Sequence, residues 1–253
     1  MARNLQFSTS ISGHTTRGNE LRGTPLGELI DQSDFVSVIF LSITGKLPSA
    51  AQKRLCNAVL VACIDHGLQP ASGFVPRVVA ASGNPILPSM ASCLLALGPA
   101  HGGAITGAMR VFEQIEAGED VEQAALDLIK QYRADKKRVP GFGHPVYTDV
   151  DPRAVQLFAL ARELGVSELY LNIARTVETH LEQELARKLV LNIDGALAAI
   201  LLTLGIPVQA GDGIFGLARV AGSIAHIVEE QQQHNSVRRL PDDAVEYVPS
   251  NKV

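Results

Sequence analysis

The stretch from Val139 to Arg153, VPGFGHPVYTDVDPR, combines a flexible turn with titratable and charged side chains. Gly141 and Gly143 flank Phe142, so the backbone can take positive φ angles there at little steric cost. His144 follows at the mouth of this turn. The first half of the stretch is therefore predicted to be a turn that presents an imidazole ring.

The second half of the stretch predicts the start of a helix, with Asp151 as the N-cap and Pro152 at the first helical position. Arg153 then falls in the first helical turn, where the partial positive charge of the helix N-terminus disfavours a cation. We therefore expect an anion close to Arg153. Together with the turn and the imidazole, this arginine indicates a site for a carboxylate substrate.

The stretch resembles the GFGHxVY…DPR signature of the citrate synthase superfamily. The resemblance runs from about Thr15 to the C-terminus. It implies a mostly helical fold, a dimer or larger homo-oligomer, and a reaction that makes or breaks a bond between the α-carbon of an acyl-CoA and a keto-acid carbonyl. The chain is shorter than an ordinary citrate synthase, chiefly at its N-terminus.

Composition narrows the classes of protein to consider. With 46% hydrophobic residues in 253, the chain is not disordered and can form one large domain or two smaller ones. A net charge of -4 gives no indication of nucleic-acid binding. Residues 1–12 are polar and unlike a signal peptide, and the longest apolar run is too short to span a bilayer. The three cysteines lack CxxC spacing and are expected to be buried thiols in a cytoplasmic, metal-free protein.

Helical periodicity and Gly or Pro punctuation run through the chain, whereas alternation of period two is nearly absent. We therefore predict an all-α fold, a single unit over 1–253 with a smaller helical part inserted around 105–205. Residues 15–21 are expected to be a surface segment with a turn, and Thr24 and Pro25 to open a short helix. Further helices are predicted over 34–44 capped by Ser33, 50–65 capped by Ser49, 89–97, 104–115, 121–136 capped by Asp120, 152–164, 168–188, 194–204 and 213–233.

His101 lies in LGPAHGGA, residues 97–104, directly before a predicted helix. At a helix N-terminus the dipole disfavours imidazolium, so a neutral ring there can donate a hydrogen bond to a developing enolate oxygen. A capping histidine in a tight turn explains the pattern equally well. The resemblance makes this segment the carrier of one catalytic histidine, and His144 that of another.

Asp194 stands in LNIDGA, residues 191–196, inside an apolar run. A buried carboxylate is costly unless it is paired or functional, and burial would raise its pKa and suit it to acid or base work at carbon. The alternative is an N-cap for the helix that follows. The resemblance makes Asp194 the catalytic aspartate, and Gly195 resembles the branch of the family that cleaves citryl-CoA.

Four further residues are expected to hold the carboxylates of the substrate. His66 lies at a predicted helix end, where it is either a cap or a ligand, and the resemblance makes it a ligand of the keto-dicarboxylate. Arg219 lies on an otherwise apolar helix, where a buried arginine needs an anion; the resemblance makes it a carboxylate ligand, as it does Arg153. His226, two turns further, could as easily be a satisfied core histidine as a ligand, and it is not assigned to the site. In the family an arginine near residues 238–239 reaches the partner subunit's site, and its spacing from Arg219 favours Arg239.

Coenzyme A is expected as part of a thioester substrate. The basic run at 136–138 is either a solvated helix end or a group of cations that attracts the phosphates of CoA. In the second interpretation, Lys137 and Arg138 are ligands of CoA. Gly141, Phe142 and Gly143 are expected to contact the same group. Pro145 stands where synthases often have an arginine.

These residues favour a citryl-CoA lyase that cleaves citryl-CoA to acetyl-CoA and oxaloacetate by a retro-Claisen reaction. In this hypothesis His144 accepts the hydroxyl proton, His101 holds the enolate and Asp194 returns a proton to carbon. The alternatives are a citrate or 2-methylcitrate synthase, which uses the same groups in reverse, and a non-catalytic partner module of a CoA ligase.

Overall fold

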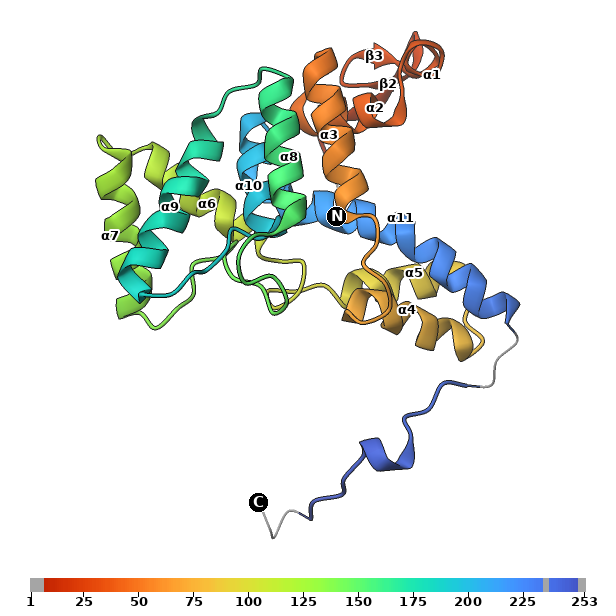
Figure 1. Ribbon diagram of the computed structural model, residues 1–253. Coiled ribbons are helices and arrows are strands. Elements are labelled where there is room, and N and C mark those ends of the chain that lie inside the picture. The colour runs from red at the N-terminus through yellow and green to blue at the C-terminus, as the bar shows by residue number, and fades with distance from the viewer. Residues whose placement is uncertain (1–6, 234–236, 250–253) are drawn as a thin grey trace, which may run out of the picture. The chain divides into compact units, whose positions relative to one another are not determined.

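The computed structural model describes residues 7–233 and 237–249 (Figure 1). The N-terminal part contains three short strands, β1 (Ser12–Thr15), β2 (Gly18–Leu21) and β3 (Thr24–Pro25). The helices are α1 (Leu26–Gln32), α2 (Phe35–Thr44), α3 (Ala50–Cys63), α4 (Ala71–Ala81), α5 (Ile86–Leu95), α6 (Ile105–Glu116), α7 (Val121–Ala134), α8 (Pro152–Glu163), α9 (Leu169–Leu185), α10 (Ile193–Thr203) and α11 (Gly211–Gln232). Two short 3-10 turns follow α10 and α11, at Val208–Ala210 and Asp242–Ala244. The predicted all-α class is confirmed.

The chain divides into two compact units. Unit 1 combines Met1–Cys63 with Gly102–Phe215, and unit 2 combines Ile64–His101 with Gly216–Val253. The part expected as an insertion, around 105–205, lies within unit 1 together with the N-terminal segment.

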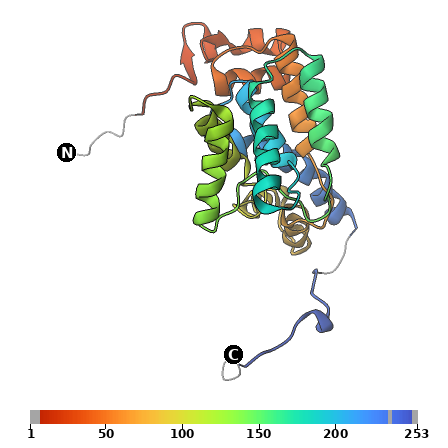
Figure 2. The ribbon, with the colours of Figure 1, turned by 60° about the vertical axis from the view of Figure 1, so that its left-hand side comes forward.

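Helix α10 is the centre of unit 1. Residues 196–201 of this helix are at most 1% exposed, because α6, α8 and α9 pack around it (Figures 1 and 2). Helix α7 packs against α9, and α3 against α8. Since α10 is apolar on every side, its sequence shows no amphipathic stripe, which is typical of a buried helix.

Unit 2 is smaller and consists of α4 and α5, packed against each other, with the part of α11 that follows Phe215. Leu94 of α5 lies within reach of Gly216, where a Cβ atom would be 3.2 Å from its Cδ2 atom. Pro76 lies inside α4, and the helix runs continuously from Ala71 to Ala81. The segment 237–249 has the 3-10 turn as its only regular element among the described residues.

Several predicted caps are confirmed. Ser49 and Gln52 form a reciprocal pair at the start of α3, in which each side chain accepts from the other's backbone N–H at 3.2 and 2.9 Å. Asp120 caps α7, and Asp151 caps α8 with Pro152 in the first turn. The expected burial of Cys56, Cys63 and Cys93 is also confirmed.

Other local predictions were wrong. Asp34 rather than Ser33 caps α2, because its carboxylate accepts from the backbone N–H of Ser37. Helix α3 ends at Cys63, and α5 begins three residues before Ser89, whose hydroxyl bonds back to the Pro85 carbonyl at 3.0 Å. Thr24 and Pro25 form β3, and the short helix predicted there, α1, begins directly after them with Pro25 as its N-cap. The surface segment with a turn predicted over 15–21 belongs to a hairpin of β1 and β2, whose strands were not predicted. All four β1 residues are exposed, so the hairpin has no buried face that would impose alternation.

Within the described residues, no helix combines the length and apolarity needed to cross a membrane.

Candidate active site

In unit 1 the GFGH turn lies along the linker between α9 and α10. Gly141 and Gly143 have φ angles of +89° and +86°, as the sequence predicted. The N–H of Gly143 donates to the Val190 carbonyl at 2.7 Å, and the N–H of Asn192 donates to the Gly141 carbonyl at 3.1 Å. The Asn192 side chain adds a bond to the Gly143 carbonyl at 2.8 Å. These bonds fix the turn on the segment that leads into α10.

A glycine pair brings the turn and α10 together. A Cβ atom on Gly195 would overlap the Gly141 carbonyl oxygen and lie 2.6 Å from Cδ1 of Leu191. A Cβ atom on Gly141 would lie 2.7 Å from Cα of Gly195. Two backbones approach this closely only where side chains are absent. Gly195, which resembles the citryl-CoA-cleaving branch of the family, therefore leaves room for the Gly141 carbonyl next to Asp194.

His144 has one ring nitrogen occupied by the backbone. The N–H groups of Val146 and Tyr147 both donate to Nδ1, each at 3.0 Å, and the ring stacks on Tyr147 with centroids 4.6 Å apart. Because backbone N–H groups only donate, Nδ1 carries the lone pair and the proton of the neutral ring lies on Nε2. His144 therefore presents an N–H donor at its other nitrogen.

Asp151 is a buried junction in unit 1, with 1% of its surface exposed. Its carboxylate accepts from the backbone N–H of Arg153 at 3.0 Å, from the Arg153 guanidinium at 3.0 and 2.8 Å, and from the N–H of Ile193 at 3.0 Å. Burial opposes ionisation, but these hydrogen bonds and the charge of Arg153 outweigh it and lower the pKa of Asp151. The anion expected beside Arg153 is thus the N-cap of its own helix.

Asp194 lies in the first turn of α10, and the interpretation of Asp194 as the N-cap was wrong. Asn192 takes that position, where its Oδ1 accepts from the N–H of Gly195 at 3.2 Å. Burial disfavours the charge of Arg153, but Asp151, with further contributions from Tyr147 and Asp194, raises the pKa of this arginine. Asp194 and Arg153 therefore interact electrostatically within unit 1.

In unit 2 a serine links two predicted site residues. The hydroxyl oxygen of Ser72 lies 2.8 Å from Nε2 of His101 and 2.8 Å from Nη1 of Arg219. Arginine only donates, so the Ser72 oxygen accepts from Arg219. A hydroxyl group has two acceptor lone pairs as well as one proton, so the contact with Nε2 suits either neutral tautomer of the His101 ring. Ser72, 0% exposed, was not identified from the sequence.

His101 is kept neutral for a different reason from the one predicted. The N-cap of α6 is Ala104, and His101 instead pairs with Gly98 through two backbone hydrogen bonds of 2.9 and 2.8 Å. Burial, followed by the charges of Arg219 and His66, lowers the pKa of His101. Desolvation and neighbouring cations, rather than a helix end, therefore favour the neutral ring.

His66 is exposed in the loop that follows α3, not at the helix end. Its neighbour Asp65 accepts from the N–H of Gly67 at 3.1 Å and pairs with Nε2 of His226 at 2.9 Å. His226, whose role the sequence left open, is therefore a partly exposed residue that links α11 to this loop.

The two C-terminal arginines differ in their surroundings. Arg238 binds Glu230 through Nε and Nη2, both at 2.8 Å. Arg239 is exposed and, among the described residues, forms no ion pair.

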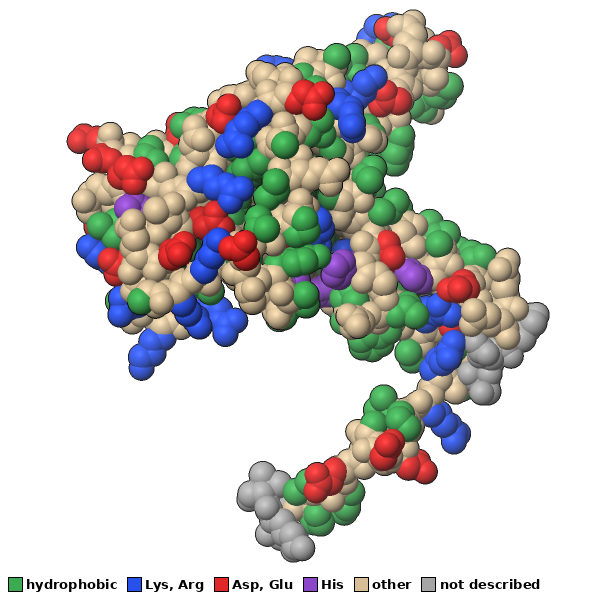
Figure 3. All heavy atoms as spheres, in the orientation of Figure 1, with side chains coloured by type: hydrophobic (Ala, Val, Ile, Leu, Met, Phe, Trp, Pro, Cys, Tyr) green, Lys and Arg blue, Asp and Glu red, His purple; other side chains and the backbone are tan. Residues whose placement is uncertain are grey.

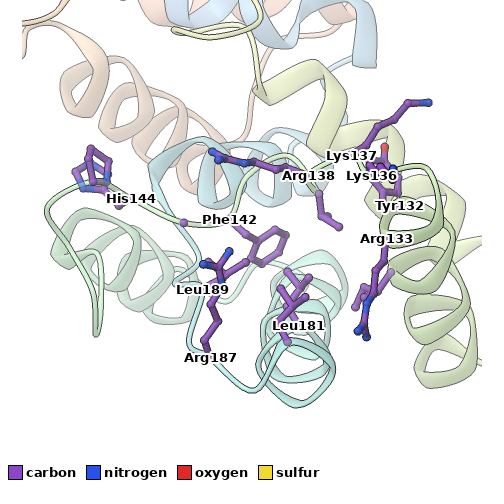
Figure 4. A pocket seen from close by; sticks show the side chains of 15 residues that line it. Tyr132, Arg133, Lys136, Lys137, Arg138, Phe142, His144, Leu181, Arg187 and Leu189 are labelled. Atoms are coloured by element: carbon purple, nitrogen blue, oxygen red, sulfur yellow. The ribbon is translucent and has the colours of Figure 1, made fainter.

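A cavity of about 570 Å³ in unit 1 lies between the ends of α7 and α9 and the GFGH turn. Lys and Arg side chains gather over these helix ends in Figure 3, and Figure 4 shows Phe142 between Arg187 on one side and the α7 end on the other. Leucines from α9 and its linker supply apolar wall, and His144 also lines the cavity. Its cations are Arg133, Lys136, Lys137, Arg138 and Arg187.

The sequence identified Lys137 and Arg138 but not Arg133, Lys136 or Arg187 as contributors. Arg187 follows Arg138 by 49 residues in the sequence. Only the packing of α7 on α9 brings the two basic groups to one cavity.

Unit 1 thus holds Arg153, Asp194 and the basic cavity that His144 lines, and unit 2 holds His66, His101, Arg219 and Arg239. This helical fold with these groups defines a citrate synthase-like enzyme. The chain belongs to the citrate synthase family, because residues 50–240 match the family's citrate synthase C-terminal domain.

The proteins similar to this chain include both a citrate synthase and lyases. Citrate synthase 2 of Bacillus subtilis (strain 168) is 31% identical over 217 residues, which cover 82% of this chain and 56% of that protein. The structure of citryl-CoA lyase from Hydrogenobacter thermophilus matches with a TM-score of 0.89 at 36% identity, over 96% of this chain and 95% of that one. ATP citrate lyase from Methanothrix soehngenii, solved with citrate and coenzyme A, matches with a TM-score of 0.84 at 25% identity, over 100% of this chain and 44% of that one. The chain spans little more than half the length of the curated synthase.

Proposed function

We propose that the protein is a citryl-CoA lyase, which cleaves citryl-CoA to acetyl-CoA and oxaloacetate. The observation that carries this proposal is the correspondence with the Hydrogenobacter lyase, which extends over nearly the whole of both chains. The identity to that lyase, 36%, is also higher than the 31% to the Bacillus synthase. For the present chain, assembly as a homodimer or larger oligomer and a cytoplasmic location are predictions from the sequence.

The basic cavity of unit 1 supports a coenzyme A site. CoA carries phosphate groups together with an apolar and an aromatic part, and the cavity offers five cations with leucine and phenylalanine walls. The cations of Arg133, Lys136 and Arg187 supply positive charge that Pro145 does not. We assign this cavity, including Phe142 and Gly143, to the CoA part of the substrate, with Gly141 shaping the turn.

The chemistry follows from the three candidate catalytic residues. The hydroxyl proton of citryl-CoA passes to His144, the carbon–carbon bond breaks, and its electron pair becomes the acetyl-CoA enolate. His101 donates a ring N–H to the enolate oxygen, and protonated Asp194 gives its proton to the enolate carbon. Because the lone pair of His144 lies on Nδ1, proton uptake requires that nitrogen to leave its two backbone donors. A change of tautomer requires the same movement, since it would place a proton on Nδ1.

The oxaloacetate part carries carboxylates that need cationic partners. We assign them to Arg153, Arg219, Arg239 and His66. Arg219 is 5% exposed and is oriented by Ser72, and Arg153 is oriented by Asp151. Guanidinium groups held in this way can form charge-assisted bonds without losing much side-chain freedom.

One assay tests the proposal. Purified protein is supplied with citryl-CoA, and separately with acetyl-CoA and oxaloacetate, while oxaloacetate and free CoA are followed. We expect citryl-CoA to be converted to acetyl-CoA and oxaloacetate without release of free CoA. Rapid CoA release with citrate formation from the second mixture would instead identify a synthase. A folded protein that is inert toward both mixtures would support the non-catalytic module.

A further inference from the structure

A buried carboxylate in unit 2 has no part in the chemistry proposed above. Glu230, on α11, is 2% exposed. Its Oε2 accepts from Nε of Arg77 at 2.7 Å and from Nη2 of Arg238 at 2.8 Å, and its Oε1 accepts from Nε of Arg238 at 2.8 Å. One carboxylate thus binds two guanidinium groups that approach from different parts of the unit.

Arg77 fixes this carboxylate from α4. It is 8% exposed, and its other nitrogens donate to Glu229 at 2.6 Å and to Gln233 at 3.2 Å. With its donors divided among two acceptors on α11 and a third directly after its end, Arg77 has little freedom to move. The orientation of Glu230 is therefore determined by the packing of α4 and α11, whether or not Arg238 is present.

The charge of Glu230 is constant over the working range of an enzyme. The hydrogen bonds from Arg238 are the largest influence, burial opposes them, and Arg77 adds to them, so that the pKa of Glu230 falls to about 2. Glu230 is thus an anion that binds Arg238 at any pH near neutrality.

Arg238 is the link to the C-terminal segment 237–249. Among the described residues of this segment, Arg238 makes the only side-chain hydrogen bonds, and all of them go to Glu230. Arg239 is the next residue and is exposed. Adjacent Cα atoms are about 3.8 Å apart, so any displacement of Arg238 carries Arg239 with it.

We infer that Glu230 is a positioning residue, which binds Arg238 and thereby sets the place from which Arg239 is presented to a substrate carboxylate. The inference rests on the proposed function, because it requires Arg239 to bind oxaloacetate. It also explains the two adjacent arginines: one is bound by the fold and the other is left exposed to act. Arg77 contributes to the same arrangement, because its hydrogen bond holds Glu230 in place.

The test compares oxaloacetate binding to the intact protein by calorimetry. Arg239→Gln should raise the Kd for oxaloacetate about tenfold or more, the loss expected for a charge-assisted bond. Arg238→Gln keeps the Glu230–Arg77 pair and should raise the Kd about three- to tenfold, in the range of coupled neighbours. The double variant should match Arg239→Gln alone, because Arg238 acts only through Arg239. Arg162→Gln, which breaks an exposed ion pair with Glu168 in unit 1, is the matched control and should leave the Kd unchanged.

Amide hydrogen exchange gives a second readout on the same proteins. Exchange in residues 237–249 should be faster in Arg238→Gln and Glu230→Gln than in wild type, and unchanged in Arg239→Gln. If Arg239→Gln weakens binding while Arg238→Gln does not, or if their effects on Kd multiply in the double variant, the positioning role is overturned. If wild type binds no oxaloacetate, or Arg239→Gln has no effect, the assignment of Arg239 fails and the inference with it.

Discussion

At the scale of single residues, Asp194 is the most direct test of the proposed chemistry. Asp194→Asn keeps the shape of the side chain but removes the transferable proton. General acid–base groups are typically worth about 10²–10⁴-fold, so we expect kcat for citryl-CoA cleavage to fall by about that factor. The affinity for citryl-CoA should stay within about threefold of wild type, because the arginines and His66 make the ground-state contacts. Steady-state kinetics with binding titrations measure both.

Asn192 provides the control for that variant. Because Asn192 caps α10, Asp194→Asn should leave the thermal unfolding midpoint nearly unchanged. Asn192→Ala removes a cap and should cost about 1 kcal/mol of stability. A stable and fully active Asp194→Asn protein would remove Asp194 from the mechanism.

His101 predicts a dependence of stability on pH. Its pKa is lowered in the folded chain, whereas in the unfolded chain it is near its ordinary value of about 6.5. Between these values the unfolded chain binds a proton that the folded chain does not, so stability falls as the pH is lowered through about 6.5. Urea unfolding at about pH 7.5 and about pH 5.5 should show this loss in wild type and a smaller loss in His101→Gln. An equal loss in both proteins would assign the pH dependence to other groups.

At the scale of secondary-structure elements, the contact of the GFGH turn with α10 depends on glycine. In Gly195→Ala the added methyl would overlap the Gly141 carbonyl, and overpacking of this kind costs about 1–3 kcal/mol. The backbone movement needed to relieve this overlap should also displace Asp194, the preceding residue, and so lower kcat. Gly213, in α11, has open space around its Cβ position, so Gly213→Ala should be neutral or stabilise by up to about 1 kcal/mol. Equal stability of the two variants in urea unfolding would show that the turn moves freely.

The basic cavity gives a second prediction at this scale. Arg187→Gln removes one of the cations that line it and should weaken binding of coenzyme A about tenfold, the loss typical of a charged hydrogen bond. Lys130→Gln removes an exposed cation of α7 that does not line the cavity, and should leave binding unchanged. Titration calorimetry at low and high salt measures both. Identical Kd values for the two variants would place the CoA phosphates elsewhere.

At the scale of the whole molecule, Arg239 is predicted to act in the partner subunit's site. Assayed well below the KM for substrate, Arg239→Ala should be weakly active in homo-oligomers, and Asp194→Asn should be nearly inactive. After subunit exchange, a hybrid dimer would contain one site with both residues intact, so random mixing should restore about a quarter of wild-type activity. Absence of any restored activity, with subunit exchange shown by differently labelled chains, would indicate that each site is built from one chain.

Features that depend on neighbours a few residues away could be predicted from the chain alone. The caps at Ser49, Asp120 and Asp151, the positive φ angles of the GFGH turn and the helical class all follow from local rules. Local rules failed where two residues satisfy them equally. Asn192 and Asp194 are both good N-caps, and only the bonds of the linker to the turn place Asn192 first.

Only the tertiary structure decided which charged and polar groups meet. Ser72 is 29 residues from His101 and 147 from Arg219, yet its hydroxyl group contacts both of them. Asp151 provides the anion for Arg153 and also binds the start of α10, 42 residues away, at Ile193. No periodicity in the chain encodes such pairs, because they arise where helices cross and bury polar groups that must then find partners.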